Sequence, residues 1–190
     1  MAQPRSVTPD GARADTPIAV DNPATGAVVG HVADASAQEV AQAVARARQA
    51  QPGWAELSAR SRAEFFARGR QWLLTHQQEI IDSIVAENGK TQEDAIVEIV
   101  YCVSAFAHWA KRARHYLADT KIRSLSPFVL GRCMYTRPVP LGFGGVIGSW
   151  NNPLIHSFGD AIPALADAKA AVLTPSEYTP LTALHLAAAV

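Results

Sequence analysis

The chain has 190 residues, enough for one ordinary domain with its own core. Lys plus Arg equals Asp plus Glu at 17 each, so charge gives no reason to expect nucleic acid or an acidic surface as a partner. The first 17 residues lack the apolar core of a signal peptide, and no apolar run approaches membrane-spanning length. These features favour a cytoplasmic protein that binds neither membrane nor nucleic acid.

The N-terminal region begins with a polar stretch and continues with short extended segments. Residues 1–17 are rich in Pro, Asp, Arg and small residues, which predicts a disordered tail. Residues 18–33 contain two β-branched runs around the turn sequence Asn-Pro-Ala-Thr-Gly, which predicts a small hairpin.

Four amphipathic helices are expected next, each with its own start or stop signal. The first begins at a capping box of Ser36 and Glu39 and is expected to end near Gln49, because Pro52-Gly53 follows. The other three are a helix capped by Ser61 and Glu64, a helix from Gln77 to about Glu87 closed by Asn88-Gly89, and a helix capped by Thr91 and Asp94 that reaches about Ala118.

The fourth helix carries the residues that could suggest reactive chemistry. Its expected core-facing residues are Ile96, Ile99, Val100, Val103 and Phe106. Cys102 lies on the same side, where a single cysteine is far more often a small core residue than a nucleophile. His108 and His115 have no carboxylate or cysteine beside them to complete a metal site, so a solvated helix face is expected and no metal.

Residues 120–139 predict a two-stranded ribbon with arms over about 121–129 and 132–139. β-branched residues alternate with polar ones in this stretch, and Gly131-Arg132 forms a turn signal. Cys133 lies on the second arm, where a structural role is expected. The chain has only these two cysteines, Cys102 and Cys133, and their spacing fits neither a metal nor a redox motif.

The last fifty residues repeat a strand, loop and helix. A glycine-containing apolar run over 143–150 is followed by Asn151-Asn152 and a helical stretch over 154–166 that Pro153 can start. A second apolar run over 170–173 is followed by Thr174 to Glu177 and a further helical stretch from Leu181. This order predicts a parallel α/β sheet, in which ligands bind beyond the carboxyl ends of the strands. Both polar clusters fall at such ends.

The same block resembles the aldehyde dehydrogenase superfamily. Its members carry a P-W-N-F-P-like loop, then P-A-L-A, then K-P-S-E-x-T-P, each at the spacing found here. The matching residues are Ser149 to Pro153, Pro163 to Ala166 and Thr174 to Pro180. Two further matches are the N-P-A-T-G turn and Glu87-Asn88-Gly89-Lys90, which is similar to the family's E-T-G-K. The resemblance covers about residues 18–190 but only the front part of the family's subunit.

The resemblance implies an α/β fold: an N-terminal helical segment, the first βαβα part of a Rossmann-like parallel sheet and a protruding β-ribbon. The expected divisions are a tail (1–17), the hairpin and helices of the cofactor-binding domain (18–119), an oligomerisation-type ribbon (120–139) and the start of the NAD(P)-binding sheet (140–190). A homo-oligomer of the full-length protein is implied as well.

The resemblance also implies roles for individual residues. Asn151 aligns with the asparagine whose amide stabilises the oxyanion formed on the aldehyde, and the alternative is that it caps the helix after Pro153. Glu177 aligns with an acidic residue that binds ribose hydroxyls, which favours NAD over NADP, and the alternative is that it complements the dipole of the following helix. The residues expected to line the cofactor cleft are Ile147, Gly148, Ser149, Trp150, Thr174, Pro175, Ser176 and Glu177.

Four departures from the family pattern put cofactor affinity in question. Thr174 replaces a lysine, Ser149 a proline and Asn152 an aromatic residue, and Asp167-Ala168-Lys169 replaces A-G-N. The family's nucleophilic cysteine and general-base glutamate lie beyond the matching segment, and neither Cys102 nor Cys133 aligns with that nucleophile.

We therefore expect the N-terminal part of an NAD(P)-dependent enzyme that oxidises an aldehyde, with some similarity to semialdehyde dehydrogenases, and an inactive chain when these 190 residues stand alone. Val190 falls within an apolar helical stretch, which favours an interrupted protein. The alternative is a non-catalytic module that joins full-length subunits. A stand-alone nucleotide-binding domain is disfavoured, because two parallel strands make an inadequate sheet with an exposed apolar face.

Overall fold

The computed structural model describes residues 17–123, 128 and 131–187. The predicted tail therefore lies outside the described residues except at residue 17, as do 124–127 and 129–130 of the predicted ribbon and residues 188–190. The strands are β1 (Ile18–Asp21), β2 (Val28–Val32), β3 (Thr120–Ile122), β4 (Met134–Thr136), β5 (Phe143–Ile147) and β6 (Ala170–Thr174). The helices are α1 (Ala37–Glu56), α2 (Ala59–Thr75), α3 (Gln77–Asn88), α4 (Gln92–Tyr116), the π-helical turn η2 (Ile155–Gly159), α5 (Ala161–Ala166) and α6 (Leu181–Ala187).

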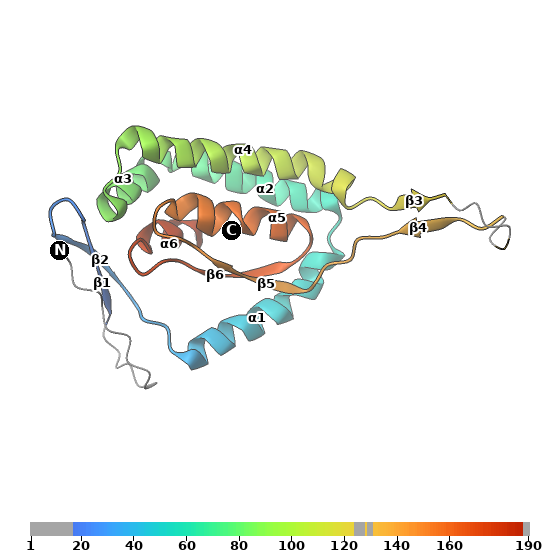
Figure 1. Cartoon of the computed structure of the whole chain (residues 1–190), viewed down its shortest axis with the longest axis horizontal. Helices are drawn as coiled ribbons and strands as arrows, with labels where there is room; N and C mark the ends of the chain where they lie inside the picture. Colours follow the sequence, from blue (N-terminus) through green and yellow to red (C-terminus); the bar gives the residue numbers. More distant parts are fainter. Residues whose placement is uncertain (1–16, 124–127, 129–130, 188–190) are drawn as a thin grey trace.

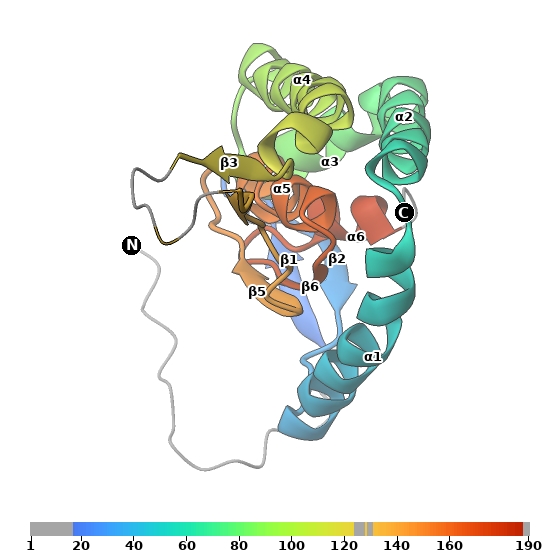
Figure 2. The same ribbon diagram turned by 90° about the vertical axis from the view of Figure 1, so that its right-hand side faces the viewer.

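The elements form layers around the η2–α5 segment (Figures 1 and 2). Helices α2, α3 and α4 make one layer, α5 lies beneath α4, and the β5–β6 pair lies between α5 and α1. The buried core sits between the helical layer and the η2–α5 segment, with Leu73, Ile80, Ile99, Phe106 and Phe158 among its members. Every residue of β5 and β6 is at least partly exposed, so the sheet has an open surface as expected for two strands.

Two predicted hairpin-like units are confirmed in the described residues. β1 pairs antiparallel with β2, and the turn between them is held by the Asn22 side chain, which accepts from the N–H groups of Ala24 and Thr25. β3 pairs antiparallel with β4 over three residues each, and this ribbon projects away from the body (Figure 1). Asp119 and Arg137 join its base through two hydrogen bonds of 2.9 and 2.7 Å.

The prediction that the first helix ends near Gln49 is wrong. α1 continues to Glu56 with Pro52 inside it. Two tertiary hydrogen bonds hold its last turns: Gln51 Nε2 donates to Ala168 O at 2.9 Å, and Trp54 Nε1 donates to Leu165 O at 2.8 Å. These contacts compensate for the helical hydrogen bond that proline cannot donate.

Two further details of the helices differ from the prediction. The second helix is capped by Ser58, whose hydroxyl accepts from Ser61 N–H, and not by Ser61. In α4 the expected core residues Ile96 and Val100 are 43% and 58% exposed. The buried face of α4 instead runs through Ala95, Glu98, Ile99, Cys102, Phe106 and Ala113. The predicted set of buried residues therefore agrees with the observed face at Ile99 and Phe106 but omits the charged Glu98.

No helix among the described residues is long and apolar enough to cross a membrane.

Candidate functional site

The two polar clusters predicted at the strand ends lie side by side. β5 and β6 are parallel, with Ile147 opposite Thr174 at their carboxyl ends. Gly148 N–H donates to Thr174 O at 2.8 Å, and the Thr179 hydroxyl donates to Trp150 O at 3.4 Å. The loops that follow the two strands are thus joined to each other by hydrogen bonds.

The predicted site residues differ in how far they reach the surface. Ile147 and Trp150 are 85% and 59% exposed, and Asn151, Thr174 and Glu177 are also exposed. Gly148 is buried against Ser157, while Ser149, Pro175 and Ser176 are half-buried. The exposed members offer polar and aromatic groups to a ligand, and the buried glycine lets the loop approach the helix below it.

A cavity of about 500 Å³ opens beside the second cluster. Thr174, Pro175, Ser176 and Glu177 line it, together with residues of the β1–β2 hairpin, of α1 and of the loop between them, which contains Asp34. Residues Ile147 to Asn151 do not line this cavity. The structure therefore brings the two predicted groups to one edge of the sheet, and the second group lines this cavity.

The Asn151 side chain is oriented by its neighbour. The Ser149 hydroxyl donates to Asn151 Oδ1 at 2.7 Å. A hydroxyl can donate to the amide oxygen, so this bond leaves the Nδ2 group as the outward donor. Among the residues that the structure describes, Asn151 Nδ2 has no hydrogen-bond partner. The site thus presents an exposed amide donor whose oxygen is already occupied.

Asn151 does not cap the helix that begins at Pro153, so that alternative is wrong. His156 N–H donates to the backbone oxygen of Asn152 at 3.0 Å. The next free N–H groups, those of Leu154 and Ile155, donate to Glu98 Oε2 at 2.9 and 3.2 Å. A carboxylate from α4 thereby fills the role that an N-cap side chain usually has.

The Lys90 ammonium binds the same loop from below. It donates to Glu98 Oε1 at 2.5 Å, to Asn151 O at 2.8 Å and to Asn152 Oδ1 at 3.2 Å. An ammonium group has three donors, so all of them are used. Asn88 Nδ2 adds a bond of 2.6 Å to Trp150 O. The backbone oxygens of two successive loop residues are therefore both held.

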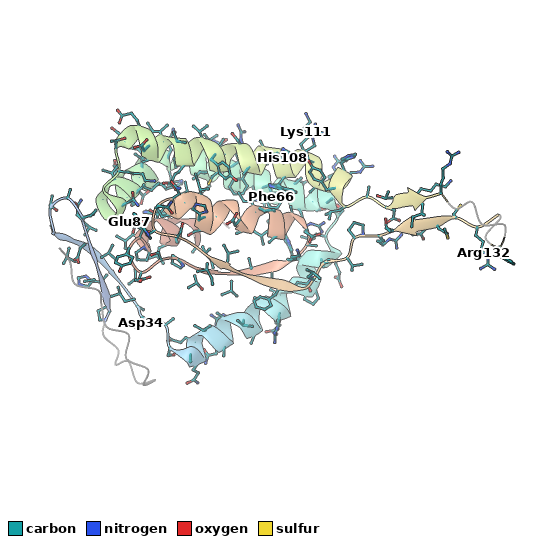
Figure 3. All side chains as sticks on the ribbon, in the orientation of Figure 1. Asp34, Phe66, Glu87, His108, Lys111 and Arg132 are labelled. Carbon is teal, nitrogen blue, oxygen red and sulfur yellow. The ribbon has the colours of Figure 1, made fainter. Side chains whose placement is uncertain are left out.

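Glu87 caps α6, the helix that follows β6, in the same manner. Its carboxylate accepts from the N–H groups of Leu181 and Thr182 at 2.6 and 2.9 Å. Burial raises the pKa of Glu87, and the hydrogen bonds from the helix partly oppose this. Glu87 lies at the end of α3 (Figure 3). These bonds place Glu87, rather than Glu177, at the start of α6.

The segment Glu87-Asn88-Gly89-Lys90 thus contacts both strand-end loops. Gly89 adopts φ 78°, a conformation that favours glycine, and a Cβ there would lie 2.6 Å from Pro23 Cγ. This left-handed residue ends α3 as predicted and lets the chain turn so that Glu87 and Lys90 reach different loops.

The sequence reading missed the roles of Glu87, Lys90 and Glu98. For Glu87 and Lys90 the signal was the similarity of Glu87-Asn88-Gly89-Lys90 to the family's E-T-G-K, which by itself predicts no contact with the strand-end loops. For Glu98 the signal was its spacing from Ala95 and Cys102, which places a carboxylate on the buried helical face.

Neither cysteine contributes to the site. Cys102 is fully buried, and burial with the nearby Glu98 charge raises the pKa of its thiol to about 12. Cys133 is exposed near the start of β4. In the described part of the chain, no three His, Cys, Asp or Glu side chains are grouped so that they could hold a metal ion.

Residues 10–190 match the aldehyde dehydrogenase family. The chain belongs to that family. A mitochondrial succinate-semialdehyde dehydrogenase of Arabidopsis thaliana is 34% identical over 170 residues, which are 90% of this chain and 31% of that protein.

Solved structures of aldehyde dehydrogenases and related proteins have the same fold. Lactaldehyde dehydrogenase from Escherichia coli superposes with a TM-score of 0.84 at 33% identity, over 94% of this chain and 36% of that one. An E. coli NADP-dependent enzyme superposes with a TM-score of 0.86 at 29% identity, over 92% of this chain and 35% of that one. The chain therefore spans about a third of the length of these three proteins.

The family uses NAD or NADP, and the residues present fit one end of such a cofactor. The 500 Å³ cavity with the exposed Glu177 carboxylate at its wall could hold a ribose through its hydroxyls. The helix starts after β5 and β6 are less suited to a pyrophosphate. Their first free N–H groups already donate to Glu98 and Glu87.

Proposed function

We propose that these residues form the N-terminal part of an NAD(P)-dependent aldehyde dehydrogenase that oxidises an aldehyde to a carboxylic acid. The observation that carries this proposal is the exposed Asn151 amide, fixed beside the loop that carries Glu177. When a nucleophile attacks an aldehyde, negative charge develops on the carbonyl oxygen, and a fixed amide N–H at that position stabilises it. Asn151 has this role in the proposal.

In this proposal, neither the nucleophilic cysteine nor the general-base glutamate is one of these 190 residues. Cys102 is unsuited because its thiol is buried and resists ionisation, and Cys133 lies on the projecting ribbon. The 190 residues alone are therefore expected to be inactive. A protein that acts only as a non-catalytic partner of full-length subunits is the alternative.

For the cofactor we favour NAD over NADP. The nicotinamide, when bound, supplies the hydride acceptor, and Ile147, Gly148, Ser149 and Trp150 are proposed to lie along its side. Glu177 would accept hydrogen bonds from the ribose hydroxyls, and its charge would repel a 2′-phosphate. Thr174, Pro175 and Ser176 complete the wall around that ribose.

For the substrate we favour a small aldehyde of the semialdehyde kind, since a relative that is 34% identical over 170 residues is named for succinate semialdehyde. A homo-oligomer built partly through the β3–β4 ribbon is proposed as well. Ile122 and Tyr135 on the two arms are 43% and 53% exposed, and apolar side chains in an exposed ribbon favour a partner. The cytoplasm is the proposed compartment.

The test is the reduction of NAD and NADP by the protein at the length its source cell makes, with succinate semialdehyde and lactaldehyde as substrates. We expect aldehyde-dependent reduction with NAD, and weaker reduction with NADP that Glu177→Gln improves. No reduction with any aldehyde, together with capture of full-length aldehyde dehydrogenase subunits, would favour the non-catalytic alternative.

A further inference from the structure

We propose that Lys90 and Ser149 are positioning residues that together fix the outward Nδ2 donor of Asn151. Lys90 holds the backbone of the loop, and Ser149 holds the amide group. This inference rests on the proposed function for its catalytic meaning, while the positioning itself is a property of the chain.

The first half of the inference is the anchoring of the loop backbone. Lys90 Nζ reaches Asn151 O at 2.8 Å and Glu98 Oε1 at 2.5 Å, with 13% of the Lys90 side chain and 1% of the Glu98 side chain exposed. The other Glu98 oxygen accepts from the helix that starts at Pro153. The Lys90 ammonium therefore connects the loop to Glu98 of α4, and Glu98 in turn binds the helix that follows the loop. Charge-assisted bonds of this kind are stronger than those between neutral groups.

The second half is the orientation of the amide. Without a partner on Oδ1, rotation about the terminal torsion of asparagine exchanges the oxygen and the NH₂ group at low cost. The 2.7 Å bond from the Ser149 hydroxyl removes this freedom. A side chain without a hydroxyl at position 149 could not make this bond. Ser149 thus gives Asn151 a preset donor.

Preset geometry matters because a donor placed 1 Å away from its productive position can lose on the order of 10²-fold in rate. Lys90 and Ser149 act through Asn151, so loss of either is expected to lower kcat and to leave KM nearly unchanged. A group that contacts only the ground state of the substrate would raise KM instead.

The variants are Lys90→Met, Ser149→Ala and Ser149→Thr, with Lys111→Met as the matched control. Met keeps the length of the lysine without its charge, and Thr keeps the hydroxyl of serine. Lys111 also belongs to the helical layer but is exposed on α4, away from the strand-end loops (Figure 3).

Nuclear magnetic resonance of the protein at its native length gives the first readout. We expect the Nδ2 proton resonances of Asn151 to differ from free-amide values in the parent and to move towards those values in Ser149→Ala, with Ser149→Thr restoring the difference. In Lys90→Met, hydrogen exchange at the Leu154 and Ile155 amides is expected to accelerate roughly tenfold or more, with no change in Lys111→Met. Free-amide values in the parent, or no difference among the variants, would overturn the inference.

The second readout is the steady-state rate of the protein at its native length. We expect a kcat loss of roughly tenfold in Ser149→Ala with rescue in Ser149→Thr. If Lys90→Met fails to fold, the Ser149 pair still decides the matter. Failure of the proposed function appears differently, as an inactive parent in which the resonance differences persist. If the parent is active, an equal kcat in Ser149→Ala and the parent would overturn the inference.

Discussion

Lys90 Nζ and Glu98 Oε1 lie 2.5 Å apart beneath the loop that follows β5, and together they connect α4 to that loop. Glu98 is almost completely buried, and its second oxygen caps the helix starting at Pro153. Such a carboxylate is stable in the interior because its charge is paired and its lone pairs are occupied. The same two residues thus stabilise the fold and set the backbone of the candidate site.

Replacing the carboxylate should be costly. Glu98→Ala removes the only carboxylate that pairs with Lys90 in the described part of the chain and leaves the Leu154 and Ile155 N–H groups without their acceptor, so we expect a loss of about 3 to 5 kcal/mol in the free energy of unfolding. Glu93→Ala, in the exposed first turn of the same helix, is the control and should lose at most about 1 kcal/mol. Urea unfolding measures both. Equal losses in the two variants would contradict the structural role of Glu98.

The buried Glu87 predicts a pH dependence of stability. Burial raises its folded-state pKa above the ordinary value of 4.5, so the folded protein holds a proton that the unfolded chain has released. The stability from this effect is fully present below pH 4.5 and is lost as pH rises through the folded pKa. Relative to the parent, Glu87→Gln should gain stability over that window, by at most about 1.4 kcal/mol per pH unit. A difference that stays constant with pH would rule this out.

The two thiols should differ strongly in reactivity. Cys102 is fully buried with its pKa raised to about 12, and Cys133 is exposed. Because the thiolate is the reactive form, iodoacetamide at neutral pH should label Cys133 rapidly and Cys102 only on unfolding. Peptide mass spectrometry of the labelled chain distinguishes the two. Rapid labelling of Cys102 in the native protein would show that its burial is not maintained in solution.

Gly148 should resist substitution because of its contact with the following helix. A Cβ at this position would overlap Ser157 Oγ, so Gly148→Ala should lose about 1 to 3 kcal/mol of stability. Gly145→Ala is the control, since a Cβ there meets no atom within 4 Å. Adding Ser157→Ala to Gly148→Ala should recover part of the loss, and additivity of the two changes would argue against the contact.

The order of the elements and the parallel pair could be predicted from local signals alone. Apolar runs, turn residues and the polar clusters after each strand determine that Ile147 and Thr174 end neighbouring strands. The end of α1 could not be predicted, because Gln51 and Trp54 find their partners more than a hundred positions along the chain. A proline is a strong local stop signal, and only these tertiary contacts override it.

The supporting residues of the site were harder to predict for the same reason. Glu98 accepts hydrogen bonds from a helix 56 positions further on, and a helical pattern gives no sign of that partner. A charged residue is assigned to the surface unless its partner is known. The role of Asn151 depended on the resemblance to aldehyde dehydrogenases, while its orientation by Ser149 emerged only from the geometry.

The most direct test of the account compares the parent and Asn151→Ala at native length in aldehyde-dependent NAD reduction. If the Asn151 amide stabilises the oxyanion, the variant should lose roughly 10²- to 10³-fold in kcat. The apparent KM for the aldehyde should change little, because the bond strengthens in the transition state. An unchanged kcat in a folded Asn151→Ala protein would contradict the assignment of Asn151 and with it the proposed site.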